Sequence, residues 1–350
     1  PILFILIESI NLKSFDLSST FSNYFTSTAL LLLYTCSISI VLAVIPAWII
    51  TYHEIKYKNI FDLLLVLPLS IPGYIMAFTY ADILGFNGYV DVFLQTYFNT
   101  RLNVDFLSIE WLSLFLSLSL YPYIYATTRI SFNLIGSTYL NLSKTLGLGK
   151  IKTFFKIIFP LSTSAISSGT LLVIMEILNE YGAVNYFGIK TFSVGIFKYW
   201  FSMNDKSSAI IFALFLLIIV LFLITALKYL KRHDEKIQYH IKTSPFIYQK
   251  KHTKKIVAYT VICIPILFGL IIPLIFITNN IKINFYKYDW IELFHILKNT
   301  FFIAILTSIV ITMISFFIIS VKRHNNTNKI KLLTNFLSSG YAIPGAVIGL

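Results

Sequence analysis

Charged residues are scarce in this chain of 350 residues, and acidic residues are the scarcest. Only 12% of the residues are charged, with 15 Asp and Glu against 28 Lys and Arg. Soluble domains carry about 25% charged residues, so this composition excludes an ordinary soluble protein. Hydrophobic residues make up 57% of the chain. We therefore expect an integral membrane protein whose first partner is the lipid bilayer.

Cysteine is almost absent, and the motifs of the common hydrolytic and metal sites are missing altogether. The two cysteines, Cys36 and Cys263, both lie in apolar runs, and the six histidines show no metal-ligand spacing. No disulfide framework and no metal site are expected. Residues 147–150 read Gly-Leu-Gly-Lys without the spacing of a phosphate-binding loop, and G-x-S-x-G and H-E-x-x-H do not occur. We expect no catalytic residues and no cofactor in this chain, which is not interpreted as an enzyme.

Long apolar runs are the main feature of the sequence. A bilayer core about 30 Å thick needs about 20 apolar residues per helix, and runs of this kind lie at 28–51, 60–80, 107–128, 161–180, 207–228, 256–278, 299–320 and 332–350. Most of them lack the polar face, repeated every 3.6 residues, of a soluble helix. The fold class is expected to be all-α and polytopic.

The net charge of +13 falls in short segments between these runs, which argues against nucleic acid as a partner. Lys and Arg gather in every second segment: 52–59, 129–160, 228–255 and 321–331. The alternate loop 81–106 carries three aspartates and Arg101. Cytoplasmic loops are enriched in Lys and Arg, so one orientation satisfies the whole chain, with 129–160 and 228–255 in the cytoplasm.

An internal repeat divides the chain. Ile-Pro-Gly occurs at 71–73 and again at 343–345, and the same offset of 272 residues places Thr28 on Thr300. Duplication predicts a first half at 1–228, a basic cytoplasmic linker at 229–255 and the start of a second half at 256–350. Because the chain begins with Pro and stops inside an apolar run, we expect it to be cut at both ends and truncated in the second half.

The segment 136–160 interrupts the apolar runs with lysines and two glycines. The positions of Gly147 and Pro160 predict a short helix, a glycine break, a second short helix and a proline that opens the next span. Such a segment could dock on a partner and transmit motion to the spans. The alternative is an amphipathic loop that lies on anionic lipid headgroups.

This segment resembles the cytoplasmic loop of binding-protein-dependent ABC importer permeases. The family's motif reads Glu-Ala-Ala, three residues, Gly, nine residues, Ile, one residue, Leu-Pro. The Glu-Ala-Ala positions are replaced here and Leu has become Phe159, while Gly, Ile and Pro match; the corresponding residues are Asn141, Leu142, Ser143, Gly147, Ile157 and Pro160. The resemblance implies a coupling loop that seats on an ATPase subunit.

The following stretch, 176–205, resembles the ferric-iron branch of these permeases, whose members have two fused permease halves. The positions that match are Glu180, Tyr181, Gly182, Phe187, Gly188, Thr191, Gly195, Ile196 and Trp200. The resemblance implies the type I (MetI-like) permease fold, a location in the bacterial inner (plasma) membrane, and ferric iron as the substrate. It also implies two partners: an ABC ATPase subunit, expected as a dimer, that binds ATP, and a periplasmic substrate-binding protein.

Other functions stay open from the sequence. The coupling loop is shared by permeases for thiamine, polyamines or sulfate. A different class, the ion-gradient secondary transporter, also has long apolar helices, and so does a membrane-embedded enzyme or assembly factor.

Two carboxylates lie near the outer end of the run 161–180. Glu176 and Glu180 are four residues apart, hence on one helix face. An ionisable group at membrane depth usually faces a cavity or a partner, and carboxylate oxygens suit a hard cation. Together with Tyr181 and Gly182 they are candidates for the substrate path or a gate. The alternative is that both carboxylates are solvated at the interface or cap the next turn.

Overall fold

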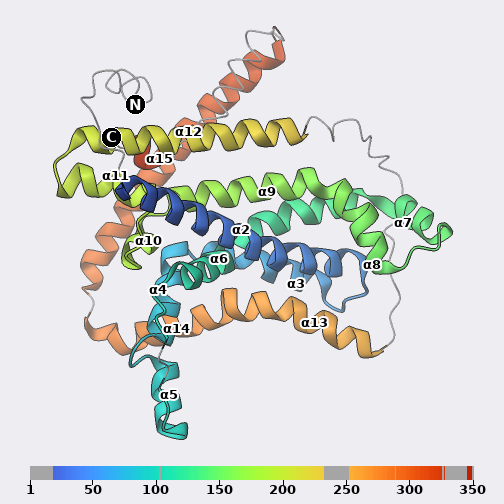
Figure 1. Cartoon of the computed structure of the whole chain (residues 1–350), viewed down its shortest axis with the longest axis horizontal. Helices are drawn as coiled ribbons and strands as arrows, with labels where there is room; N and C mark the ends of the chain where they lie inside the picture. The colour runs from blue at the N-terminus through green and yellow to red at the C-terminus, as the bar shows by residue number, and fades with distance from the viewer. Residues whose placement is uncertain are drawn as a thin grey trace. The chain divides into compact units, whose positions relative to one another are not determined.

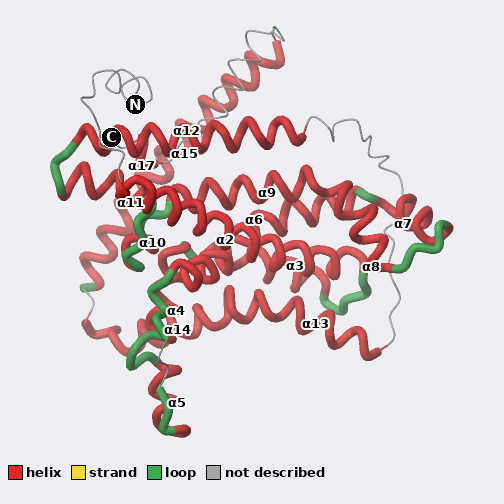
Figure 2. Tube along the Cα trace, in the orientation of Figure 1, coloured by secondary structure: helices red, strands yellow, loops and turns green. Residues whose placement is uncertain are grey.

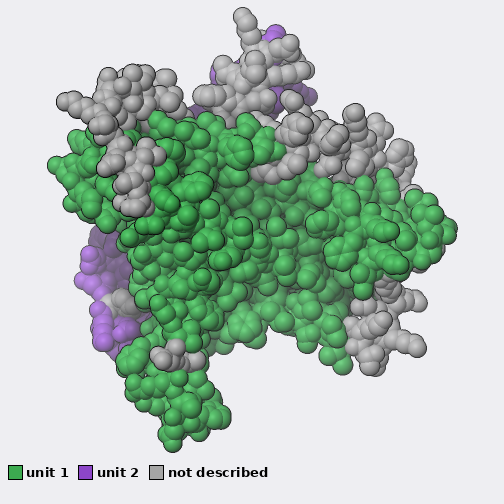
Figure 3. Space-filling model, viewed as in Figure 1, with its two compact units in different colours: residues 1–275, 344–350 green, residues 276–343 purple. Residues whose placement is uncertain are grey.

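The computed structural model describes residues 19–101, 104–231, 252–287, 289–324, 327 and 345–348. Every regular element in these ranges is helical (Figure 2), which confirms the all-α prediction. The chain divides into two compact units, residues 1–275 with 344–350 and residues 276–343, coloured separately in Figure 3.

The first unit holds most of the helices. In chain order these are α2 (Ser19–Tyr52), α3 (Lys58–Val66), η1 (Leu67–Ser70), α4 (Gly73–Leu84), α5 (Tyr89–Phe98), α6 (Ile109–Leu134), α7 (Gly136–Thr145), α8 (Lys150–Thr153), η2 (Phe154–Ile158), α9 (Phe159–Asn179), α10 (Gly182–Tyr186), α11 (Phe192–Phe197), η3 (Lys198–Ser202), α12 (Lys206–Lys231), α13 (His252–Ile266), η4 (Leu267–Ile271) and α17 (Gly345–Ile348). Helix α14 (Ile272–Asn284) continues past the boundary of this unit, and the second unit holds η5 (Phe285–Lys287) and α15 (Trp290–His324).

Five helical stretches of the described residues are long and apolar enough to cross a membrane: 21–52, 151–179, 206–223, 256–287 and 290–324. They correspond to five of the predicted runs, and the prediction of a multi-pass membrane protein is confirmed. The predicted run at 332–350 falls almost entirely outside the described residues, as does most of the linker 229–255.

The prediction of a single span at 60–80 needs correction, because this segment is not one straight helix. The helical stretches 58–70 and 73–98 meet at a bend of 89°. Pro72 cannot donate a backbone hydrogen bond and disfavours a helical conformation in the residue before it, and Ile71 is extended, with φ −98° and ψ 111°. The hydroxyl of Ser119 donates to the carbonyl of Ile71 at 2.6 Å. A bend at membrane depth is tolerated where a neighbouring helix satisfies the freed backbone in this way.

Helix α6, expected from the run 107–128, is not among the strongly apolar stretches. It packs against α2, α9 and α4 at the centre of the first unit (Figure 1). Most of its serines and tyrosines are buried inside that unit, among them Ser113, Ser117, Ser119, Tyr121 and Tyr125. Small and hydroxyl-bearing residues allow close approach and hydrogen bonding between membrane helices, so the polarity of α6 reflects its central position.

Candidate coupling and translocation site

The coupling segment begins with a helix that a glycine ends. After α7, Gly147 adopts φ +68°, and the N–H of Leu148 donates to the carbonyl of Ser143 at 2.9 Å. A residue in the left-handed conformation with this 6→1 hydrogen bond is the Schellman end of a helix, which glycine favours because it has no Cβ. The predicted glycine break is therefore confirmed in its geometry.

The second part of the segment is joined to the membrane span. Pro160 lies in the first turn of α9, as predicted, but the helix is continuous from residue 151 to 179. The π-helical turn η2 precedes the proline, and the N–H of Phe159 bonds to the carbonyl of Phe154. Such a turn accommodates a proline ring within a helix. The predicted second short helix is thus the first part of one continuous helix, residues 151–179, which we call the rod.

The surface of this segment is apolar as well as basic. Side chains on both sides of the turn are exposed, among them Leu142, Leu146, Ile151 and Phe155. Of the other predicted residues, Asn141 and Pro160 are exposed, Ile157 is half-buried and Ser143 is buried. Exposed large apolar side chains grouped on one segment are typical of a protein or membrane contact.

At the opposite end of α9, Glu180 caps the next helix. One carboxylate oxygen of Glu180, Oε1, accepts a hydrogen bond from the N–H of Ala183 at 2.9 Å, at the start of α10. The hydroxyl of Ser193 donates to the carbonyl of Glu180 at 2.9 Å. A carboxylate is stabilised at a helix N-terminus by the helix dipole. Glu180 thus caps α10, which was one of the two roles expected for it. The other role, contact with the substrate, remains a prediction.

Glu176 and Tyr181 have separate surroundings. The hydroxyl of Tyr123 on α6 donates to Glu176 at 3.2 Å. The Tyr181 ring packs against Phe197 with 4.5 Å between centroids. Glu180 follows the last residue of α9 in an extended conformation, with φ −70° and ψ 115°, so it is not part of the helix face predicted for both carboxylates. Glu176 contacts α6 and Glu180 contacts α10.

The bend of the broken span lies against Glu180, a contact that the sequence did not indicate. A methyl group at Gly73 would lie 3.1 Å from Oε2 of Glu180 and 3.0 Å from Leu116, and one at Gly182 would lie 3.3 Å from Cβ of Tyr74. The first turn of α4 thus lies close to Glu180 and to the start of α10, and a side chain at either glycine would require these neighbours to shift by a few tenths of an ångström.

Gly345, the glycine of the second Ile-Pro-Gly, also contacts this end of α9. The N–H of Gly345 donates to Oδ1 of Asn179 at 2.7 Å. Both repeated glycines, Gly73 and Gly345, therefore contact the Asn179–Glu180 corner. The repeated Ile-Pro-Gly is the feature of the sequence that marks both of these glycines, although the repeat by itself predicts only a duplication.

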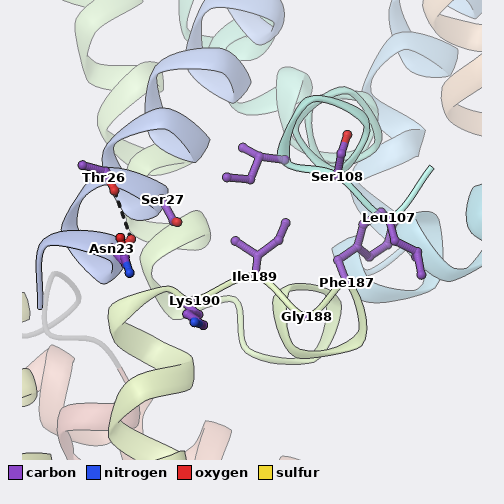
Figure 4. A pocket seen from close by; sticks show the side chains of 10 residues that line it. Asn23, Thr26, Ser27, Leu107, Ser108, Phe187, Gly188, Ile189 and Lys190 are labelled. Carbon is purple, nitrogen blue, oxygen red and sulfur yellow. Dashed lines mark hydrogen bonds between the residues drawn. The ribbon is translucent and has the colours of Figure 1, made fainter. Parts of the chain in front are cut away.

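A pocket of about 350 Å³ opens near the N-terminal ends of α2 and α6 (Figure 4). Hydroxyl, amide and amine groups line it with a few apolar side chains, and none of the lining residues is acidic; they are Asn23, Thr26, Ser27, Leu107, Ser108, Ile109, Phe187, Gly188, Ile189 and Lys190. The sequence did not single out Lys190, because a lone lysine in an outer loop carries no pattern. Among the described residues, no group of three His, Cys, Asp or Glu side chains could hold a metal.

Comparison with known proteins places the fold and these segments in one family. Residues 38–233 match the family described as "Binding-protein-dependent transport system inner membrane component". This match contains the broken span, α6, the coupling segment and the Asn179–Glu180 corner.

Similar proteins carry different substrate names. The sulfate transport system permease protein CysT of Salmonella typhimurium is 28% identical over 144 residues, which cover 41% of this chain and 50% of that protein. The Fe(3+)-transport system permease protein FbpB 2 of Haemophilus influenzae is 27% identical over 197 residues, 56% of this chain and 35% of that protein. The molybdenum transport system permease protein ModB of the same organism is 26% identical over 147 residues, 41% and 62%.

These similarities do not favour iron over the oxyanions, and the chain spans half or less of the sulfate and iron relatives. The family match itself covers more than half of the chain. This chain belongs to the family of inner membrane components of binding-protein-dependent transport systems, and it is an all-α, multi-pass inner-membrane protein homologous to ABC importer permeases.

Proposed function

We propose that this chain is the translocation subunit of an ATP-driven importer, which works with a separate ATPase and a substrate-binding protein. The observation that carries the proposal is the segment 136–160. It places a left-handed Gly147 and exposed apolar side chains at the tip of a helix that continues to Asn179. A lipid-bound loop needs neither the rigid turn nor the joined rod. In this proposal the chain hydrolyses no ATP.

The rod explains how ATP binding acts on the substrate path. The continuous helix 151–179 has 29 residues, so it is about 44 Å long at 1.5 Å per residue. When the ATPase subunits close and displace the tip, the rod moves its other end, where Glu180 and Asn179 contact the broken span and the second Ile-Pro-Gly. Small shifts at one end of a packed helix can switch a transporter between inward-open and outward-open states.

Ferric iron is the substrate that we propose first. The support is the sequence pattern of 176–205 and the pair of carboxylates Glu176 and Glu180, since carboxylate oxygens suit a hard cation. A second candidate is an oxyanion such as sulfate or molybdate. The names of the sulfate and molybdenum relatives support it as much as that of the iron relative supports iron, and the pocket of hydroxyls around Lys190 also supports it.

Two homologous halves are part of the same proposal, with 1–228 and 256–350 joined by the basic linker 229–255. The contact of Gly73 and Gly345 with neighbouring residues of one corner supports it. Repeats that surround a shared path are common in transporters.

Uptake by a strain that lacks the gene tests the substrate. Loss of labelled ferric iron uptake, with normal sulfate and molybdate uptake, would support iron. Loss of sulfate or molybdate uptake would transfer the assignment to an oxyanion, and loss of thiamine or polyamine uptake would exclude both. Purification of the tagged chain tests the importer class separately, because an importer subunit should bring an ATPase and an ion-gradient transporter should not.

A further inference from the structure

An ion pair between a buried arginine and a half-buried aspartate lies in the first unit, away from the Asn179–Glu180 corner. Arg129 on α6 is only 9% exposed, and its Nε lies 3.4 Å from Oδ1 of Asp62 on α3. The hydroxyl of Tyr125, one turn earlier on α6, donates to the same carboxylate oxygen. The carboxylate of Asp62 thus interacts with both the guanidinium of Arg129 and the hydroxyl of Tyr125.

The same guanidinium also reaches a third helix. Its Nη1 donates to Oγ1 of Thr51 on α2 at 3.2 Å and to Oδ1 of Asn133 on α6. Thr51 is buried. One arginine therefore connects α2, α3 and α6 near the junction of the first two.

The network lies next to the coupling segment. The Phe154 ring packs against Trp48 on α2, with 5.2 Å between centroids, and against Phe132 on α6, with 6.5 Å. Phe132 is one turn from Arg129, and its carbonyl accepts a hydrogen bond from the hydroxyl of Tyr52, the neighbour of Thr51. The coupling segment therefore contacts α2 and α6, two of the helices that the arginine connects.

Packing alone does not require this pair. Burial of the Arg129 guanidinium costs free energy that offsets much of its attraction to the half-buried Asp62, and well-packed apolar residues would hold the helices at least as firmly. An ion pair differs from apolar packing in having discrete made and broken states. It suits a contact that must be released and remade.

We propose that Asp62 and Arg129 are positioning residues that transmit movement of the coupling segment to α3, the inner half of the broken span. The inference rests on the proposed importer function. Helix α3 leads through η1 to Pro72 and Gly73, and Gly73 lies against Glu180. The pair therefore joins the start of the rod, at Phe154, to the Asn179–Glu180 corner by a second route, which runs through α3 and α4 instead of along α9.

Charge exchange tests the pair. The variants Asp62→Asn, Arg129→Gln and the exchanged double variant Asp62→Arg with Arg129→Asp are assayed for uptake and for ATPase co-purification. Each single variant should lower uptake by about tenfold or more, a coupling typical of close charged pairs, and the exchange should restore part of it. Asp82→Asn, an exposed aspartate on α4, is the matched control and should be normal.

A distance measurement separates transmission from simple structural support. Spin labels replace Ile60 on α3 and Ile130 on α6, both exposed, in the complex with its ATPase. In the wild type, the distance distribution should change between the nucleotide-free state and the state trapped with ATP and vanadate. In Asp62→Asn the change should be lost while the ATPase still co-purifies.

Normal uptake in both single variants, or an unchanged distance response in Asp62→Asn, would overturn the inference. Absence of the ATPase from the purified wild type would instead count against the importer proposal itself. A single variant that fails to accumulate while the exchanged double variant accumulates and transports would still support a direct pair.

Discussion

A methyl group at Gly169 would lie 2.6 Å from Cα of Ile124, so α9 and α6 approach each other with no room for a side chain. The same methyl would lie 2.5 Å from Oγ1 of Thr127. Lipid tails are as apolar as the side chains that they would replace, so membrane helices depend on such close packing for their association. This contact joins the rod of the coupling segment to the central helix.

Gly169→Ala should therefore destabilise the protein, because the added carbon forces α9 away from α6. Overpacking of this kind costs about 1–3 kcal/mol, so thermal unfolding in detergent should begin at a lower temperature. Gly149→Ala is the matched control, since a methyl there meets nothing within 4 Å. Equal stability of the two variants would contradict the close contact.

Gly147→Val should abolish coupling without loss of the protein from the membrane. A left-handed conformation costs a non-glycine residue about 1–2 kcal/mol, and a β-branched residue is a stronger outlier. The turn should open and misplace the exposed apolar side chains. Membrane abundance, uptake and receptor-stimulated ATPase activity are measured together. Gly149→Val, a glycine without positive φ in the same loop, should transport normally, and normal transport by Gly147→Val would indicate a lipid-bound loop.

Glu180→Gln and Glu180→Ala separate the two roles of this residue. Glutamine keeps an oxygen that can accept the hydrogen bond from Ala183 but removes the charge, whereas alanine removes both. If the charge assists a cation, both variants should slow iron uptake. If Glu180 only caps α10, the glutamine variant should transport normally and the alanine variant should be less stable, by about 1 kcal/mol. Uptake and thermal unfolding of both variants distinguish these outcomes.

The orientation of the chain is tested by cysteine labelling. Cys36 and Cys263 are first replaced by alanine, and single cysteines are then introduced at Lys152 and Tyr97, both exposed. An impermeant maleimide added to cells with a permeabilised outer membrane should label position 97 only. Labelling at 152 under these conditions would reverse the topology inferred from the lysine distribution.

The elements that depend on local chemistry could be predicted from the sequence. The apolar runs predicted the membrane helices, and Gly147 predicted the turn, because a run of apolar residues and a glycine act through their own backbone and solvent preferences. The capping alternative for Glu180 came from the same local reasoning. Iron was preferred over other substrates on a motif resemblance, and the relatives support oxyanions equally.

The features that depend on packing could not be predicted. Pro72 indicates in the sequence that the span is interrupted, but not by how much. A bend as large as 89° requires a neighbour that satisfies the carbonyl of Ile71, and here that neighbour is Ser119. The partners Asp62 and Arg129 lie on α3 and α6, with η1, α4 and α5 between them along the chain. Nothing local shows which face of α6 meets α3, because the polar residues of α6 have no simple periodicity.

Photo-crosslinking from the coupling segment tests the central claim most directly. A photoreactive amino acid is placed at Leu146 or Ile151, at the exposed tip, and at Tyr97 as the control on the opposite side; these side chains are 65%, 70% and 72% exposed. Illumination of cells should yield an adduct with the ATPase subunit from positions 146 and 151 and none from 97. An ATPase adduct from position 97, or only lipid adducts from 146 and 151, would contradict the account.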